Sequence, residues 1–255
     1  MNVLAIGNSH LAAFKAACEA LLPDCGRVQY LPSPQIVNAG DFFGGRTLVA
    51  RLQFAGPDAT EVAVHDPAET HLVIVGNGLF GHFAVFCPAP DRKLPCFVWS
   101  DDLAPSLPVL ASCAWSSRLV SRSLFRELYA DGVRHHVLQR WSMTPDFLRR
   151  FRKVTMFASP TPGARFFVEH SACPDVAAYL GAGCLRVFKA NYRALVDEFV
   201  ATLPCAVAVS YPIVEEDTVG CTQDRFLLAE EIQVHANHQY WTSRITSAIE
   251  MGMWS

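Results

Sequence analysis

Short apolar runs alternate along the chain with longer segments in which apolar residues recur every three or four positions. Short runs bounded by glycine, proline or asparagine are typical of buried strands, and the periodic segments are typical of amphipathic helices. Strands that alternate with helices form parallel sheets through right-handed crossovers. The pattern predicts one α/β domain over residues 1–255, with three α/β/α layers and about five parallel strands, at residues 3–6, 27–31, 70–75, 154–159 and 206–210.

The periodic segments predict helices whose apolar faces pack on the sheet. Helix is expected at residues 11–22, after the first strand, and again in a last segment that begins near His235. Over residues 175–203 the apolar side chains share one face, and Lys189 falls among the charged positions elsewhere. Another helix is predicted over residues 117–137, with an apolar face made of Leu119, Leu124, Leu128 and Val133.

Two segments are longer than a minimal sheet needs. Residues 80–152, after the third strand, hold a proline-rich stretch and the predicted helix at 117–137. An insertion of this size usually covers or shapes a pocket, so we expect an insertion or lid that selects the substrate. Residues 51–69 contain short alternating pieces and predict a small hairpin at the edge of the domain.

Ser9 follows the first predicted strand and precedes the first predicted helix. Gly7 is expected to let the chain turn sharply there. A serine on such a turn stands near free backbone N–H groups and the positive end of the helix dipole, which favour developing negative charge. Ser9 is therefore a candidate nucleophile. The alternative is that its side chain caps the helix, because serine is a favoured N-cap residue.

The residues Gly7-Asn8-Ser9-His10 resemble the first block of the SGNH (GDSL-like) hydrolases, whose nucleophilic serine follows the first strand. Residues 234–240 resemble the closing block of the same family, which supplies the catalytic histidine. The resemblance implies a flavodoxin-like three-layer fold and a serine esterase or acyltransferase that acts through an acyl-enzyme. In this chain Ser9 would be the nucleophile and His235 the general base.

The resemblance also implies donors for the oxyanion. The Ser9 N–H is one of them, and Gly45 matches the glycine of the second block, with Gly44 as the neighbouring alternative. Asn77, after the third predicted strand, resembles the asparagine of the third block, although Gly76 directly precedes it and the usual pattern separates the two by one residue. Paired glycines or an asparagine can instead serve only to form a turn.

A third group normally orients the imidazole of a catalytic histidine. The family places an aspartate three residues before that histidine, where this chain has Ile232. Glu231 is the nearest acidic substitute, and Asp224 and Asp217 are more distant ones. A backbone carbonyl could also orient His235, which would leave a Ser-His dyad.

Composition and charge limit the classes of function. The chain has 255 residues, of which 51% are hydrophobic, and a net charge of −3, so no polyanionic partner such as nucleic acid is indicated. No run approaches the roughly 18 uninterrupted apolar residues of a membrane helix. The N-terminus has no leader pattern, and the nine cysteines form no C-x-x-C pair, so we expect buried thiols in a cytoplasmic protein.

The predicted chemistry needs a small-molecule or carbohydrate ester as substrate and no cofactor or metal. The adjacent pair His135-His136, and His238, lack a third ligand at recognisable spacing and are expected on the surface. One alternative is a catalytically inactive SGNH-fold binding or regulatory protein, which the substitution at Ile232 favours. A flavodoxin-like nucleotide binder is disfavoured, because no phosphate-binding glycine pattern follows the first strand.

Overall fold

The structure is a computed structural model of the whole chain. It describes residues 2–22, 28–32, 35–38, 47–53, 59–77, 97–98, 100–101, 119–138, 143–170, 175–229 and 235–254.

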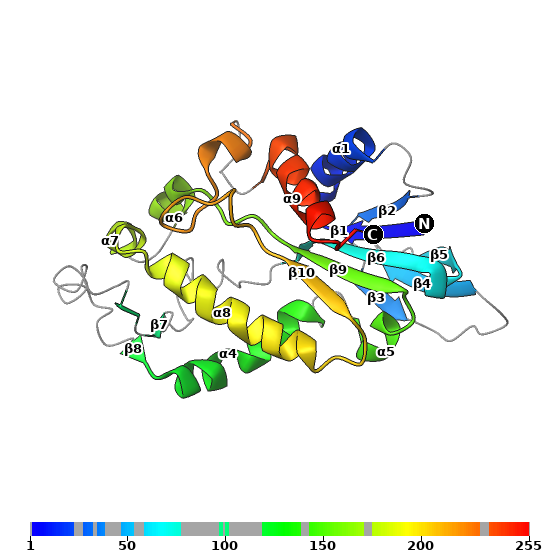
Figure 1. The fold of residues 1–255 in the computed structure, drawn as a ribbon, viewed down its shortest axis with the longest axis horizontal. Helices are drawn as coiled ribbons and strands as arrows, with labels where there is room; N and C mark the ends of the chain where they lie inside the picture. Colours follow the sequence, from blue (N-terminus) through cyan, green and yellow to red (C-terminus); the bar gives the residue numbers. More distant parts are fainter. Residues whose placement is uncertain are drawn as a thin grey trace.

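Five parallel strands form the central sheet and confirm the predicted α/β class (Figure 1). Their order is β10-β9-β6-β1-β2, so β1 is hydrogen-bonded on both sides, to β2 and to β6. The strand that precedes Ser9 is thus an internal strand, fixed by both neighbours. The five strands are β1 (Asn2–Gly7), β2 (Val28–Pro32), β6 (Thr70–Asn77), β9 (Lys153–Ala158) and β10 (Val207–Ser210).

Alternate side chains of β1 enter two separate apolar cores, one on each face of the sheet. Val3 and Ala5 pack in the core beneath α1 and α9, whereas Leu4 and Ile6 pack in the core beneath α4 and α8. This is the period-two alternation of a strand buried on both faces. Figure 1 shows the two helix layers on opposite sides of the sheet, as the three-layer prediction requires. Their bounds are α1 (Leu11–Leu21), α4 (Arg122–Val137), α8 (Cys184–Ala201) and α9 (His238–Glu250).

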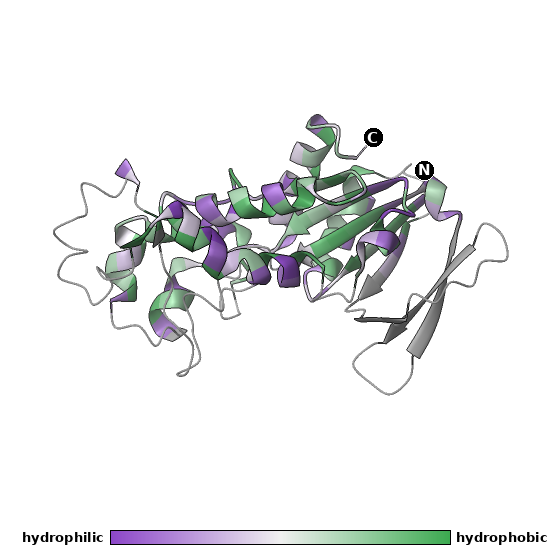
Figure 2. Ribbon diagram, turned by 90° about the horizontal axis from the view of Figure 1, so that it is seen from below, coloured by the Kyte–Doolittle hydropathy of each residue, from purple (hydrophilic) through white to green (hydrophobic). Residues whose placement is uncertain are grey.

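Figure 2, turned by 90°, shows hydrophobic strands in the middle of the sheet and helices in which hydrophilic and hydrophobic residues are mixed. Among the residues the structure describes, no helix has both the length and the apolar character that crossing a membrane requires. The described cysteines Cys18, Cys184, Cys205 and Cys221 are all in the thiol form, and all but Cys205 are buried.

The single helix predicted over residues 175–203 is wrong. The structure has two helices there, α7 (Val176–Gly181) and α8, because Gly183 between them adopts a left-handed conformation with φ 75°. Such a residue ends the ladder of helical hydrogen bonds, and glycine tolerates it without a steric penalty. Residues 175–203 therefore bend at Gly183 before the long helix begins.

The helix predicted over residues 117–137 begins later and buries another face. α4 starts after Ser121, whose hydroxyl accepts the Leu124 N–H at 3.2 Å, and Leu119 lies in a short strand instead. Phe125 and Val133 are buried, whereas Leu119, Leu124 and Leu128 are 41–46% exposed. The buried positions follow a spacing of four residues from Phe125, so Val133 is buried as predicted, but Phe125 is buried in place of Leu124.

The other elements lie around this sheet. An antiparallel pair, β4 and β5, is present, but only β5 and the end of β4 lie within residues 51–69, where the hairpin is predicted, and β3 pairs with β4 as a third strand. Most of the predicted insertion, residues 80–152, lies outside the described residues. The remaining bounds are β3 (Gln35–Asn38), β4 (Thr47–Gln53), β5 (Ala59–His65), η1 (Pro67–Glu69), β7 (Phe97–Val98), β8 (Leu119–Val120), α5 (Pro145–Leu148), α6 (Ala164–His170) and η5 (Asp224–Phe226).

Candidate active site

The carboxyl ends of the parallel strands are level with one another and form one edge of the sheet. Gly7 of β1 lies beside Val75 of β6, Val75 lies beside Phe157 of β9, and Phe157 lies beside Ser210 of β10. In open α/β sheets this edge is where ligands bind. The segment that carries Ser9 leaves the sheet at this edge.

Ser9 lies in the turn between β1 and α1, and it is exposed. The turn is closed by the Leu11 N–H, which donates to the Asn8 carbonyl at 2.9 Å. The N-cap of α1 is His10, and no side chain caps this helix, so capping does not explain Ser9. No acceptor among the described residues takes the Ser9 N–H, so this backbone donor at the turn can still form a hydrogen bond.

Gly7 is needed for close packing and not for a left-handed turn. It is absent from the glycines with positive φ, but a Cβ atom at this position would lie 2.9 Å from the Val75 carbonyl oxygen. A side chain there would push β1 away from β6. The close packing of Gly7 on Val75 therefore fixes the position from which the Ser9 turn leaves the sheet.

Asn8 connects the Ser9 turn to the end of β6. Its Nδ2 donates to the Gly76 carbonyl at 2.8 Å, and its Oδ1 accepts the His10 N–H at 3.1 Å. Gly76 has φ 73° and lies where the register between β6 and β9 shifts, between Val75 and Asn77. The same carboxamide therefore fixes the backbone on both sides of Ser9 relative to the neighbouring strand.

His235 reaches Ser9 from the other end of the chain. The Ser9 Oγ and the His235 Nε2 lie 2.9 Å apart, across 226 positions of sequence. With the ring proton on Nδ1, Nε2 accepts the hydroxyl proton, which is the arrangement that a general base needs. The structure thus brings together the two residues that the terminal motifs single out.

Hydrogen bonds connect the backbone around His235 to η5 and to the residues that follow it. The His235 carbonyl accepts the Leu228 N–H at 3.1 Å, and the Asn237 N–H donates to the Phe226 carbonyl at 2.8 Å. The Asn237 side chain also caps α9, accepting the Tyr240 N–H at 3.2 Å while its Nδ2 donates to the Arg225 carbonyl at 2.8 Å. Asn237 therefore joins the helix start to the segment that positions the imidazole.

His10 is a member of this cluster that the sequence analysis missed. Its ring is 7% exposed and meets the His235 ring edge to face, with the centroids 5.3 Å apart. Burial, and then the neighbouring His235, lower the pKa of His10 to about 3, so its ring is neutral near physiological pH. The spacing of His10, Phe14 and Cys18 at every fourth position puts His10 on the apolar face of α1, and this signal could have revealed its burial.

The other predicted site residues are only partly placed. Gly45, its alternative Gly44, and Glu231 lie outside the described residues. Asn77 is the last residue of β6, beside Ala158, and its backbone is thus at the predicted edge. Of the distant acidic candidates, Asp217 uses its Oδ1 to accept two backbone N–H groups of its own loop, at 3.0 and 2.9 Å.

A buried ionic cluster, which the sequence analysis also missed, lies in the loops after β9 and β10. Lys189 of α8 donates to the Glu216 carboxylate, to Thr161 Oγ1 at 2.6 Å and to the Gly220 carbonyl at 3.0 Å. Burial lowers the pKa of Lys189 and raises the pKa of Glu216, in each case against the partner's charge. Lys189, which the sequence places among the charged positions off the apolar face of the helix, is thus buried, because the loop that carries Glu216 covers this part of α8.

Arg244 and Glu215 form a second buried ion pair, with Arg244 Nη1 3.8 Å from Glu215 Oε2. Arg244 of α9 donates to the Tyr211 carbonyl and to Ser210 Oγ, the latter at 2.8 Å, at the end of β10. Glu215 accepts the Ser243 hydroxyl at 2.5 Å and the Ile213 N–H at 3.1 Å. Together, the two ionic groups connect the loops after β9 and β10 to α8 and α9, and so hold these loops at the edge of the sheet.

Comparisons of the chain with known proteins returned no match, whether to protein-family models, to curated proteins or to solved structures.

Proposed function

We propose that the protein is a serine hydrolase or acyltransferase that acts on an ester-linked acyl group. The observation that carries the proposal is the 2.9 Å contact between Ser9 Oγ and His235 Nε2 at the carboxyl edge of a parallel sheet. A serine hydroxyl is a weak nucleophile unless a base accepts its proton in the transition state, and a histidine within hydrogen-bond distance meets this need. An exposed serine on a turn also leaves room for a substrate.

In the proposed reaction the Ser9 Oγ attacks the acyl carbon while His235 Nε2 takes the hydroxyl proton. The tetrahedral intermediate collapses, the bond to the alcohol oxygen breaks, and His235 returns the proton to this leaving oxygen. Water or an acceptor alcohol then attacks the acyl-enzyme, with His235 again as the base, and releases Ser9. The reaction needs no oxidant, reductant or cofactor.

The tetrahedral intermediate carries an oxyanion that must be stabilised. The Ser9 N–H at the start of α1 is one donor, and the positive end of the helix dipole adds to it. The resemblance to SGNH hydrolases assigns two further donors, the Gly45 N–H and the Asn77 amide. Removal of one such donor typically lowers the rate on the order of a hundredfold or more.

The support for an SGNH-type enzyme has two parts. The two terminal motifs resemble the corresponding blocks of that family, and the residues they single out are in contact. In this proposal the neutral His10 ring packs against His235. Glu231 or a backbone carbonyl orients the other ring nitrogen of His235, Nδ1. Ile232, which stands at the family's aspartate position, is the specific feature that favours the alternative, a binding or regulatory protein without turnover.

The direct test is labelling of the purified protein with a serine-reactive fluorophosphonate, followed by mapping of the modified peptide. We expect one adduct, on Ser9, which Ser9→Ala abolishes and which forms on the order of a hundredfold more slowly in His235→Ala. Ser123→Ala, a change to an exposed serine on α4, is the matched control and should label normally. A chain that folds but forms no adduct over the whole pH range would refute the proposal and favour the binding protein.

A further inference from the structure

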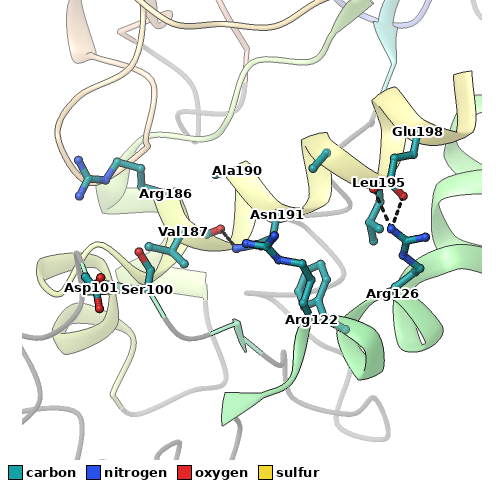
Figure 3. A pocket seen from close by; sticks show the side chains of 12 residues that line it. Ser100, Asp101, Arg122, Arg126, Arg186, Val187, Ala190, Asn191, Leu195 and Glu198 are labelled. Carbon is teal, nitrogen blue, oxygen red and sulfur yellow. Dashed lines mark hydrogen bonds and ion pairs between the residues drawn. The ribbon is translucent and has the colours of Figure 1, made fainter. Parts of the chain in front are cut away.

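A pocket of about 800 Å³ lies between α4 and α8, and neither Ser9 nor His235 lines it. Helix α4 contributes Arg122, Phe125 and Arg126, and residues 100–101 close one end (Figure 3). The volume is in the range of small-molecule sites, which are typically roughly 300–1,000 Å³. The proposed acyl-transfer chemistry makes no use of this pocket.

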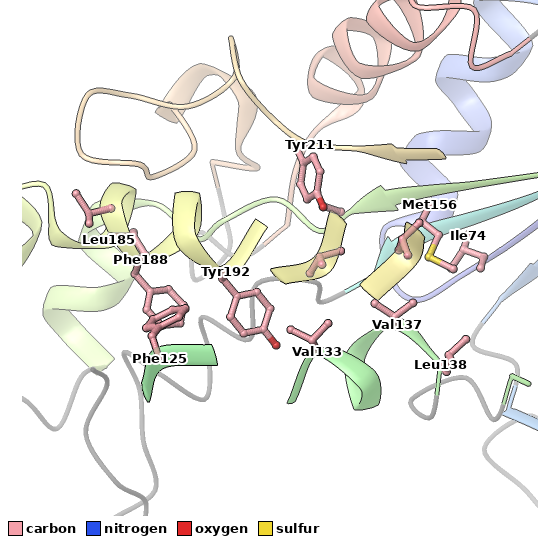
Figure 4. Close-up of a cluster of buried hydrophobic side chains, with 14 of the residues drawn as sticks. Ile74, Phe125, Val133, Val137, Leu138, Met156, Leu185, Phe188, Tyr192 and Tyr211 are labelled. Atoms are coloured by element: carbon pink, nitrogen blue, oxygen red, sulfur yellow. The ribbon is translucent and has the colours of Figure 1, made fainter. Parts of the chain in front are cut away.

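The pocket has an apolar wall on a well-packed base. Ala190, Ala194 and Leu195 of α8 line it with side chains that are at least partly exposed, whereas Val187 of α8 and Phe125 of α4 are buried, Phe125 being 1% exposed. The Phe125 ring packs on Phe188 with the centroids 5.7 Å apart, and Figure 4 shows these two side chains meeting in the core between the helices. Core packing therefore holds the α4–α8 side of the cavity in place, so a ligand would not have to order this side.

The charged groups of the pocket are not evenly matched. Three arginines and two carboxylates line it, which gives the lining one net positive charge. Arg126 is satisfied by Glu198, whose two carboxylate oxygens each lie 2.8 Å from its Nη2. No carboxylate among the described residues pairs with Arg122, whose side chain extends from α4 towards Asn191 of α8 (Figure 3).

The positions of these groups limit where an anion can bind. Figure 3 shows Asp101 at one end of the pocket and Glu198 at the other, with Arg122 between them. Both carboxylates repel a second negative charge, whereas the planar guanidinium of Arg122 can give two parallel hydrogen bonds to one carboxylate or phosphate group. Asn191 donates its Nδ2 to the Val187 carbonyl at 2.9 Å, which fixes the side chain that faces Arg122.

We propose that this pocket is a second binding site, for a small organic molecule with one anionic group, a carboxylate or a phosphate monoester, on an apolar body. The anionic group is held by Arg122, and the apolar body lies on Ala190, Ala194 and Leu195. This inference goes beyond the proposed acyl transfer and does not depend on it.

Isothermal titration calorimetry with three probes of the same body tests the site: 1-naphthoate, 1-naphthyl phosphate and the neutral 1-naphthol. We expect at least one of the two anions to bind about tenfold or more tightly than naphthol, and Arg122→Gln to remove that advantage. Arg134→Gln removes an exposed arginine of the same helix outside the pocket and is the matched control. Thermal melts verify that both variants fold.

Each outcome decides the proposal. Preference for the phosphate or for the carboxylate identifies the anionic group, and either one supports the site if it is lost in Arg122→Gln and kept in Arg134→Gln. Equal affinity for the three probes, no binding of any probe, or an anion preference that survives Arg122→Gln would overturn it. Ser9→Ala should bind as the parent does, so a failed labelling experiment at Ser9 and a failed titration here are separate results.

Discussion

The carboxamide of Asn8 occupies the space into which a side chain on Gly76 would project. A Cβ atom at position 76 would lie 2.3 Å from Asn8 Oδ1, and the Gly76 carbonyl accepts the Asn8 Nδ2 at 2.8 Å. Gly76 also has φ 73°, a conformation that costs other residues about 1–2 kcal/mol. The turn that carries Ser9 and the end of β6 therefore fit together only with glycine at position 76.

Gly76→Ala should lower the free energy of unfolding by about 2–4 kcal/mol, because backbone strain and the clash with Asn8 add together. Gly181→Ala is the matched control, since nothing lies within 4 Å of a Cβ atom there, and it should be neutral or slightly stabilising. Urea denaturation measures both. Combining Gly76→Ala with Asn8→Ala should cost at least about 1 kcal/mol less than the sum of the single changes. Simple additivity would contradict the proposed clash.

Asn237→Ala should affect both stability and the reactivity of Ser9. It removes the cap of α9 and the contact to the Arg225 carbonyl, so we expect a loss of about 1–2 kcal/mol. Fluorophosphonate labelling of Ser9 should also slow by about tenfold or more, because the segment that positions His235 is released. Ser121→Ala removes a comparable cap from α4 and should lower stability without slowing the labelling. Equal labelling rates in the two variants would show that Asn237 does not position His235.

His10 should make the protein less stable as the pH falls. Its pKa is lowered from 6.5 to about 3 in the folded state, so below pH 6.5 the unfolded chain binds a proton that the folded chain does not. Stability from this group is therefore complete above the unfolded pKa and is lost as the pH falls towards 3. His10→Phe should reduce the slope of unfolding free energy against pH by up to about 1.4 kcal/mol per pH unit. Chemical denaturation in a pH series measures it, and an unchanged slope would contradict burial of a neutral ring.

Lys189→Met should be strongly destabilising, by about 3–5 kcal/mol, because it leaves the Glu216 carboxylate buried without its partner. Replacing both residues with methionine should recover part of this loss, since no uncompensated charge remains. Lys15→Met, in an exposed pair with Glu19, is the control and should change stability by less than about 1 kcal/mol. If the double variant were as unstable as the sum of its parts, the two charges would not be coupled.

Local patterns predicted the strands well and the helix details less well. The largely apolar runs at β1, β6 and β9 specify strands buried on both faces, because such strands admit few polar residues. The break at Gly183 and the buried face of α4 depend on which of several apolar positions meets a neighbour. Leu124 and Phe125 are adjacent and both apolar, and only the packing of Phe125 on Phe188 decides between them.

The sequence alone determined the α/β class and the order of the main strands along the chain. It also determined the two terminal motifs, with Ser9 and His235. Each of these features depends on patterns among residues that are close together in the sequence. Only the tertiary structure decided that these two residues are 2.9 Å apart, that His10 is buried against His235, and that Lys189 is enclosed by Glu216. Each of these contacts depends on how separate segments fold over the carboxyl edge of the sheet. Local spacing can indicate that a residue such as His10 is buried, but it does not identify the partner, because partners are fixed by the packing of strands and helices far apart in sequence.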